Sequence, residues 1–308
     1  MMKKKLAILS ILSIVAINAN AQYYPLFSQY LSNGVLLNPA YTGSRDVLSV
    51  NAMHRSQMIG FKGAPSYQSF TAHMPLKNEN IGIGLMALNE KAGPIQNTHI
   101  YATYAYRVAA GPGKLAFGLK AGLNYGNYGW SNLYTNESGD PAFENNNTTL
   151  LLPNLGAGIY YYSNTFFTGL SIPYFLSYKE KNSHDGFEIF HDINNYNFLL
   201  TAGFLLNISP NLRIKPSTLL KYNMTAKEQF DINLNIITLN DMLSFGALYR
   251  TGEAMAGIVE VQLNHQLRIG CTYEYSTPST NTYNYYSFEF SVRYEFLYKI
   301  KAANPRLF

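Results

Sequence analysis

The sequence contains little charge and almost no cysteine. Of its 308 residues, only 13% are charged, against roughly 25% in typical soluble domains. Cys271 is the single cysteine, so no disulfide can form within the chain. The net charge of +5 falls to +2 without Lys3, Lys4 and Lys5, and the later basic residues are scattered singly. The composition therefore excludes a disulfide scaffold and gives no support to nucleic-acid binding.

Long apolar runs are also missing, which excludes a helical membrane protein. The one apolar stretch, Leu6 to Ile17, follows the three lysines and precedes Ala19-Asn20-Ala21. This order is typical of an exported protein's signal peptide, and we expect cleavage between Ala21 and Gln22. A membrane anchor is the alternative, but the stretch is too short to span the bilayer.

The sequence is instead rich in aromatic residues, at 15%, with 26 tyrosines and 23 glycines. Apolar and polar residues alternate in many segments, most clearly in Tyr286 to Phe296 (YSFEFSVRYEF). A period of two predicts strands with one apolar and one polar face. We expect about fourteen strands, over residues 47–54, 67–74, 80–88, 98–109, 114–125, 153–162, 166–175, 195–207, 212–222, 230–237, 242–250, 258–264, 268–275 and 286–296. Pro216, within one of them, predicts a bulge.

The connections between these strands differ in length in an alternating way. Short turns such as Gly111-Pro112-Gly113 alternate with mostly long links, among them 55–66, 89–97, 129–152 and 176–194. A soluble β-sandwich also alternates, but aromatic residues at the strand ends and long loops at one end favour a membrane barrel. The sequence thus predicts an all-β, transmembrane, antiparallel up-and-down β-barrel in the outer membrane of a Gram-negative bacterium, with periplasmic termini.

Four regions are expected along the chain. They are a cleaved signal peptide at 1–21, a segment at 22–46 packed in or under the barrel, the barrel at 47–298 and a periplasmic tail at 299–308.

Charged residues on the polar faces would point into the lumen. They could line a selective pore, or form a network of salt bridges that fills the lumen or holds a plug. The candidates for this network are Arg107, Lys120, Lys215, Arg250, Arg268, Glu274, Glu289 and Arg293.

Catalytic and metal-binding patterns are weak. His184-Asp185 and His191-Asp192 fall in one expected outer loop, and Asn136 to Asn147 holds three carboxylates without the register of a calcium loop. A membrane-embedded lipase or acyltransferase would need Ser or His beside a carboxylate at one rim, and no such group can be assembled from these strands. We therefore expect no enzyme, no cofactor and no metal site.

Two stretches carry a specific signature, Pro25 to Ser44 (PLFSQYLSNGVLLNPAYTGS) and His54 to Pro65 (HRSQMIGFKGAP). Together with Tyr104-Ala105-Tyr106-Arg107, Lys215-Pro216-Ser217 and the ending Asn304 to Phe308, they resemble the PorP/SprF family over essentially the whole mature chain. The ending departs at Leu307, where the family more often has an aromatic residue. The resemblance implies a non-enzymatic outer-membrane barrel of the type IX secretion and gliding-motility apparatus. The implied partners are the secretion components and an exported surface protein with a C-terminal sorting domain, such as a large adhesin.

The first stretch, Pro25 to Ser44, is too apolar to remain exposed to water, and the second, His54 to Pro65, is expected to form the first outer loop. They are expected either to pack within the barrel as a plug or constriction, or to contact a partner. The candidate residues are Phe27, Tyr30, Asn38, Pro39, Tyr41, His54, Arg55, Gln57, Phe61 and Lys62. A porin-like or transporter channel for a small solute is the alternative function, since the lumen is charged.

Overall fold

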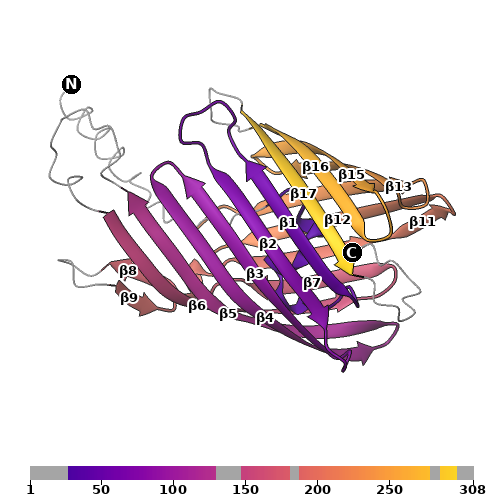
Figure 1. The fold of residues 1–308 in the computed structure, drawn as a ribbon, viewed down its shortest axis with the longest axis horizontal. Coiled ribbons are helices and arrows are strands. Elements are labelled where there is room, and N and C mark those ends of the chain that lie inside the picture. The colour runs from indigo at the N-terminus through magenta and orange to yellow at the C-terminus, as the bar shows by residue number, and fades with distance from the viewer. Residues whose placement is uncertain (1–26, 130–146, 181–186, 278–284, 297–308) are drawn as a thin grey trace, which may run out of the picture.

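The computed structural model describes residues 27–129, 147–180, 187–277 and 285–296. Their strands form one closed antiparallel barrel with a fourteen-strand wall (Figure 1), as the sequence predicted. The sheet closes because β10 pairs with both β7 and β12, while the first and last strands, β1 and β17, pair with each other. The expected signal peptide and the expected tail at 299–308 lie outside the described residues.

The wall strands follow one another in sequence around the barrel. The first seven are β1 (Leu48–Ser56), β2 (Ser66–Pro75), β3 (Ile81–Ala92), β4 (Ile95–Ala110), β5 (Gly113–Gly129), β6 (Asn147–Tyr162) and β7 (Phe166–Ile172). The others are β10 (Phe198–Phe204), continued by β11 (Leu206–Ser209), then β12 (Leu212–Tyr222), β13 (Gln229–Thr238), β14 (Leu243–Arg250), β15 (Ala254–Gln262), β16 (Leu267–Ser276) and β17 (Tyr286–Phe296). A separate hairpin, β8 (Ser177–Glu180) with β9 (Phe187–Phe190), pairs only with itself among the described strands.

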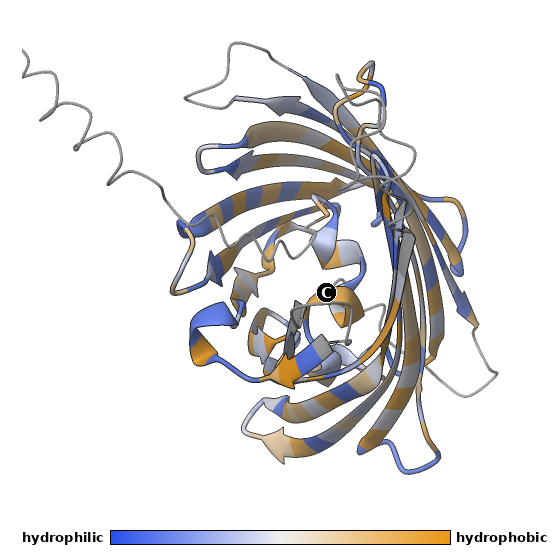
Figure 2. Ribbon diagram, turned by 90° about the vertical axis from the view of Figure 1, so that its left-hand side faces the viewer, coloured by the Kyte–Doolittle hydropathy of each residue, from blue (hydrophilic) through white to orange (hydrophobic). Residues whose placement is uncertain are grey.

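The predicted alternation divides the inside of the wall from the outside. In β17, Ser287, Glu289 and Ser291 are buried in the lumen, whereas Phe288 and Phe290 are exposed on the outer surface. The same alternation colours the strands in stripes in Figure 2. The outer surface is apolar, and neighbouring strands are hydrogen-bonded to each other around the wall. The barrel is therefore suited to insertion in a lipid bilayer. Among the described residues, no helix has the length and apolar character needed to cross a membrane.

The two ends of the barrel differ. Leu48 pairs with Phe296, so β1 starts and β17 ends at the same end. That end, called the inner end here, also carries the turns at 76–80, 111–112, 163–165, 210–211, 239–242 and 263–266. The opposite, outer end carries the connections 57–65, 93–94, 223–228 and 251–253. The two longest stretches of sequence between wall strands also separate strand ends found there, since β5 ends at Gly129 and β6 begins at Asn147, and β7 ends at Ile172 and β10 begins at Phe198. Since short turns face the periplasm in such barrels, the outer end faces the cell surface.

Three local expectations were wrong. Residues 89–97 are not a long loop, because β3 and β4 pair up to Ala92 and Ile95 and turn at Gly93-Pro94. Pro216 causes no bulge against β13, where the register is continuous. Instead the ladder on the other side of β12 is interrupted at Phe204 and Leu205, which lie opposite Pro216 and Lys215. Pro216 has no N–H to donate to such a ladder. Finally, β7 ends at Ile172, immediately before Pro173.

Short helical turns before β1 lie inside the ring of strands (Figure 2). They are η1 (Tyr30–Ser32), α2 (Gly34–Leu37) and η2 (Pro39–Tyr41), and a further turn, η4 (Ile193–Asn195), precedes β10.

Candidate functional site

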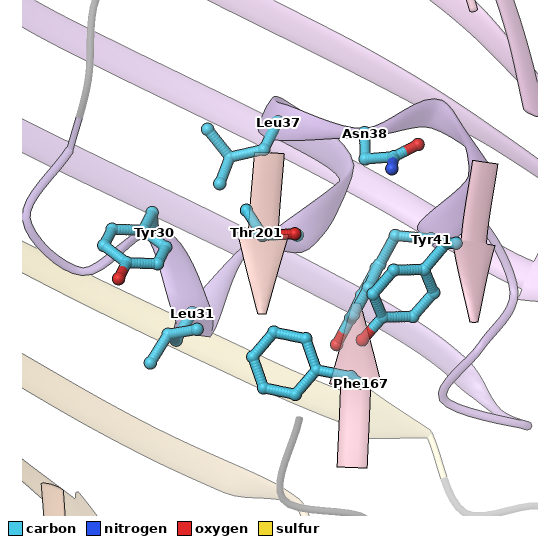
Figure 3. Close-up of a pocket in the computed structure, with 9 residues that line it drawn as sticks. Tyr30, Leu31, Leu37, Asn38, Tyr41, Phe167 and Thr201 are labelled. Carbon is cyan, nitrogen blue, oxygen red and sulfur yellow. The ribbon is translucent and has the colours of Figure 1, made fainter. Parts of the chain in front are cut away.

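Residues 27–46, called the luminal segment here, run through the barrel interior. Its apolar side chains divide among the three buried hydrophobic clusters of the described residues, with Phe27, Tyr30 and Tyr41 each in a different one. Figure 3 shows Tyr30, Leu37 and Tyr41 facing Phe167 and Thr201 of the wall around a small pocket. The segment therefore packs as an internal core, and the interior it occupies is not an open channel there.

The luminal segment crosses the barrel from the outer end to the inner end. Phe27 packs edge-on against Tyr67, at the outer end of β2, with ring centroids 6.4 Å apart. At the other end, Arg45 lies beside Glu295, near the inner end of β17. The segment thus closes the lumen over most of its depth.

Asn38 attaches the middle of the segment to the wall. Its side-chain amide donates to the backbone carbonyls of Ile159, at 2.9 Å, and Leu170, at 3.4 Å, between β6 and β7. Its Oδ1 accepts from Ala40 N–H at 2.9 Å and so caps η2. Pro39 is favoured at the next position because it supplies no N–H where a helix start needs none.

Wall glycines let the segment approach the strand backbone. A Cβ at Gly118 would lie 2.0 Å from Ala40 N, and one at Gly82 would lie 2.3 Å from the carbonyl oxygen of Thr42. Any larger residue at either position would push the segment away from the wall. Gly82 and Gly118 thus serve as contact points for the luminal segment.

An outer charge cluster holds the start of the segment; it comprises Arg55, Asp231, Arg250, Glu274 and Glu289. Arg55 pairs with Glu274, at 2.7 Å, and with Glu289. Arg250 pairs with Asp231 at 3.0 Å and with Glu274 at 3.5 Å.

The outer cluster has three carboxylates and two guanidinium groups. The segment helps to compensate this excess, because the N–H groups of Ser28, at 2.7 Å, and Gln29, at 3.0 Å, both donate to Glu289. Ser28 Oγ donates to Glu274 at 2.6 Å. Buried charges require such partners, so the cluster and the segment stabilise each other.

An inner charge cluster holds the other end; it comprises Arg45, Glu260, Arg268, Arg293 and Glu295. Arg45 Nε donates to Glu295 at 2.7 Å, and Arg293 Nη1 donates to the carbonyl oxygen of Ser32 at 3.2 Å. Glu260 accepts from Ser32 Oγ and pairs with Arg268 at 3.4 Å.

A family model described as type IX secretion system membrane protein PorP/SprF matches residues 19–294. The chain belongs to this family. It is thus a membrane protein of a secretion-system family, an outer-membrane barrel rather than a member of an enzyme class.

The chain is also similar to solved structures of other proteins. The CymD monoaromatic hydrocarbon channel has a TM-score of 0.52 and 10% identity, over 91% of this chain and 95% of that chain. A Pseudomonas aeruginosa FadL homologue has a TM-score of 0.49 and 10% identity, over 89% and 95%. At 10% identity the likeness to CymD concerns the fold alone. A comparison with curated proteins finds no match.

The remaining predicted lumen charges of this PorP/SprF protein also point inward. Arg107 is fully buried and donates to the carbonyl oxygen of Gly43. Lys120 Nζ lies 4.6 Å from the ring centroid of Tyr101 and 4.5 Å from that of Tyr174, a cation–π arrangement. Lys215 is buried in the wall of β12.

The second signature stretch forms the first outer connection of this PorP/SprF barrel. Backbone hydrogen bonds fix its path, from Gln57 to Pro65 at 2.9 Å, from Ile59 to Tyr286 at 2.9 Å and from Gly93 to Gly63 at 2.8 Å. The loop presents Ile59 and Phe61, which are 52% and 53% exposed, and the exposed Lys62. His54 and Arg55 belong to β1 instead, with His54 exposed outside and Arg55 in the outer cluster.

Some residues of the site were not among the sequence candidates. Ser28 contacts the outer cluster and Arg45 belongs to the inner one. Asn154 of β6 is buried and bonds the backbone of Phe175 and Leu176, which follow β7. None of these three residues stands out in the sequence. Arg45 is the first charged residue after the uncharged stretch Pro25 to Ser44, which could have drawn attention to it. Within the described ranges, no group of three or more His, Cys, Asp or Glu could hold a metal ion. The predicted cleavage residues Ala21 and Gln22, and His184, lie outside the described residues.

Proposed function

We propose that this PorP/SprF protein supports export or surface anchoring of a partner protein, without enzymatic activity. The partner would be an exported surface protein with a C-terminal sorting domain, such as a large adhesin, in type IX secretion and gliding motility. The observation that carries the proposal is the luminal segment, which fills the barrel and is held by charged clusters at both ends. A solute channel, the alternative function, needs an open path that this segment occupies.

The loop at 57–65 supports a docking role at the cell surface. Its backbone hydrogen bonds hold Ile59 and Phe61 in place although both are exposed. A fixed apolar pair presented to solvent is typical of a binding surface, because binding then loses little conformational entropy. Phe61 and Lys62 thus remain our candidates for partner contact, and Arg55 holds the plug.

The proposal is tested by the double substitution I59S/F61S. Loss of two apolar contacts at the centre of an interface costs about 2 kcal/mol or more, so we expect about a thirtyfold loss of the exported protein that co-purifies with the barrel from detergent. The matched control is Met224→Ser, which removes an exposed apolar side chain from another outer connection. Unchanged surface display of every exported adhesin in a strain that lacks the protein would refute the proposal.

A further inference from the structure

The inner end of the lumen carries more positive than negative charge. Lys215 of β12 lies close enough to interact electrostatically with three members of the inner cluster, Arg45, Arg268 and Arg293. With this lysine, the cluster has four cations beside its two carboxylates. The outer cluster has the opposite excess, and N–H groups of the luminal segment compensate it. The lumen is therefore polarised, with its positive end at the periplasm.

Both carboxylates of the inner cluster are already shared between donors. Glu295 accepts from Arg45 Nε at 2.7 Å and lies 3.4 Å from Arg293 Nε. Glu260 accepts from Ser32 Oγ and lies 3.4 Å from Arg268 Nη1. A strong charge-assisted hydrogen bond is about 2.7–2.9 Å long, so these two arginines are only loosely paired. Within the described part of the chain, their Nη2 groups donate no hydrogen bond.

Arg107 adds a further positive charge beside this cluster. Its side chain is fully buried, and Nη1 donates to the carbonyl oxygen of Gly43, whereas Nε and Nη2 have no acceptor among the described residues. His73 accepts from Gly43 N–H at 2.9 Å. This histidine interacts electrostatically with both Arg107 and Arg45, which places the two arginines at the same end of the lumen. Five cations and two carboxylates therefore lie together there.

The remaining charges of the inner end do not offset this excess of three. Arg213 pairs with Asp241, and Lys114 lies 3.9 Å from Asp46, so each of these pairs is neutral. Residues 297–308, which follow β17 in the sequence, contain three basic side chains and no acidic one. Buried charge without a counter-charge is costly. Carboxylates supplied from outside the chain would therefore stabilise this end of the barrel.

The cations lie where the periplasm can reach them. Arg268 is the second residue of β16, directly after an inner turn, and Arg293 lies near the inner end of β17. The side chains of Arg268 and Glu260 are each 11% exposed, and that of Glu295 is 15% exposed. Ser32 of the luminal segment contacts the cluster from the side of the outer end. The exposed parts of the cluster thus face the inner opening.

The rim of this opening is apolar beside the charge. Leu239 and Met242, in the turn between β13 and β14, are more than half exposed, and so is Leu263, in the next inner turn along the wall. Guanidinium groups bind carboxylates and phosphates through paired N–H groups. A free inorganic anion gains nothing from an apolar rim, whereas a protein segment buries it. Cations beside an apolar rim therefore favour an acidic protein segment as the ligand.

We propose that the inner mouth, formed by the inner cluster with Arg107 and Lys215, binds an acidic segment of a periplasmic protein. Carboxylates of that segment pair with Arg268 and Arg293, and its apolar residues cover Leu239 and its neighbours on the rim. The proposal concerns the periplasmic face, and it does not depend on the surface role of the loop at 57–65.

The first test measures binding of fluorescein-labelled hexaglutamate to the full chain in detergent, by fluorescence anisotropy at low salt. We expect saturable binding that is about tenfold weaker for R268Q/R293Q, because two charged donors are lost. R268K/R293K keeps both charges and should bind more tightly than R268Q/R293Q. Lys77→Gln, which removes an exposed charge from another inner turn, is the control and should bind like the wild type. Equal affinity of R268Q/R293Q and the wild type would overturn the proposal.

Inorganic phosphate separates a protein ligand from a free anion. We expect phosphate to displace the peptide no better than chloride does at the same ionic strength, since both then act by screening alone. Displacement by phosphate far below the effective chloride concentration would make the mouth a phosphate site and overturn the proposed partner.

A second test remains valid if R268Q/R293Q does not fold. Benzoylphenylalanine is placed in living cells at Leu239 and, separately, at Leu263, and the photoadducts are mapped by mass spectrometry. We expect both positions to reach one stretch of the same periplasmic protein, and that stretch to be rich in Asp and Glu. Adducts with lipid or with this chain alone, or with a stretch that has no acidic residues, would overturn the proposal.

Discussion

Buried charge is the feature that most distinguishes individual residues of this barrel. Glu289 is fully buried and accepts from Arg55 and from two N–H groups of the luminal segment. Each of these donors would lose its charged partner if the carboxylate were neutralised. A single residue of the wall therefore couples the barrel to its plug.

We predict that Glu289→Gln lowers the free energy of unfolding by about 2 kcal/mol, because Arg55 and the N–H groups of Ser28 and Gln29 lose a buried charged acceptor. Urea unfolding in detergent micelles, followed by tyrosine fluorescence, measures the change. Glu79→Gln, in an exposed inner turn, is the control and should leave the midpoint unchanged. A midpoint for E289Q equal to that of the wild type would show that the pair does not stabilise the fold.

The luminal segment is the element for which the structure adds most to the sequence prediction. Asn38 and the wall glycines fix it against the strands, and the two charge clusters fix its ends. A fourteen-strand barrel is wide enough to conduct when it is empty. Whether it conducts thus depends on this one element.

We predict that deletion of residues 28–44 opens the barrel. In planar bilayers the full chain should show no large steady conductance, whereas the deletion variant should show one, because its lumen then fills with water. Circular dichroism and heat modifiability check that the variant still folds. A large steady conductance of the full chain would favour the porin-like alternative and contradict our account of the segment.

On the scale of the whole molecule, the short turns and the long connections give the barrel its direction. The loop at 57–65 should then lie on the cell surface and the turn at 76–80 in the periplasm. The proposed docking role of the loop at 57–65 depends on this orientation.

We predict that, in a Cys271→Ser background, Phe61→Cys is labelled by a membrane-impermeant maleimide on intact cells. Lys77→Cys should be labelled only after the outer membrane is permeabilised. Both side chains are exposed in the structure, so a difference in labelling reports sidedness. The reverse result would show that the barrel has the opposite orientation in the membrane and that the loop at 57–65 does not lie on the cell surface.

The sequence by itself determined the barrel. Alternation fixes which face of each strand is apolar, and turn residues fix where the strands end, and both signals are local. The number of strands, their order and the inward direction of Arg250, Glu274 and Glu289 follow from these signals. The type IX assignment came from the signature stretches, for which the sequence alone indicated only packing within the barrel or contact with a partner.

Only the tertiary structure decided what those residues contact. That Asn38 reaches the carbonyls of Ile159 and Leu170, or that Ser28 meets Glu289, depends on contacts between residues far apart in the chain. The early end of the pairing between β6 and β7, at Ala157 and Ile172, is similar, since a strand carries no sign of whether its neighbour continues beside it. Local patterns set the faces of strands, whereas closure of the barrel sets which faces, edges and charges meet.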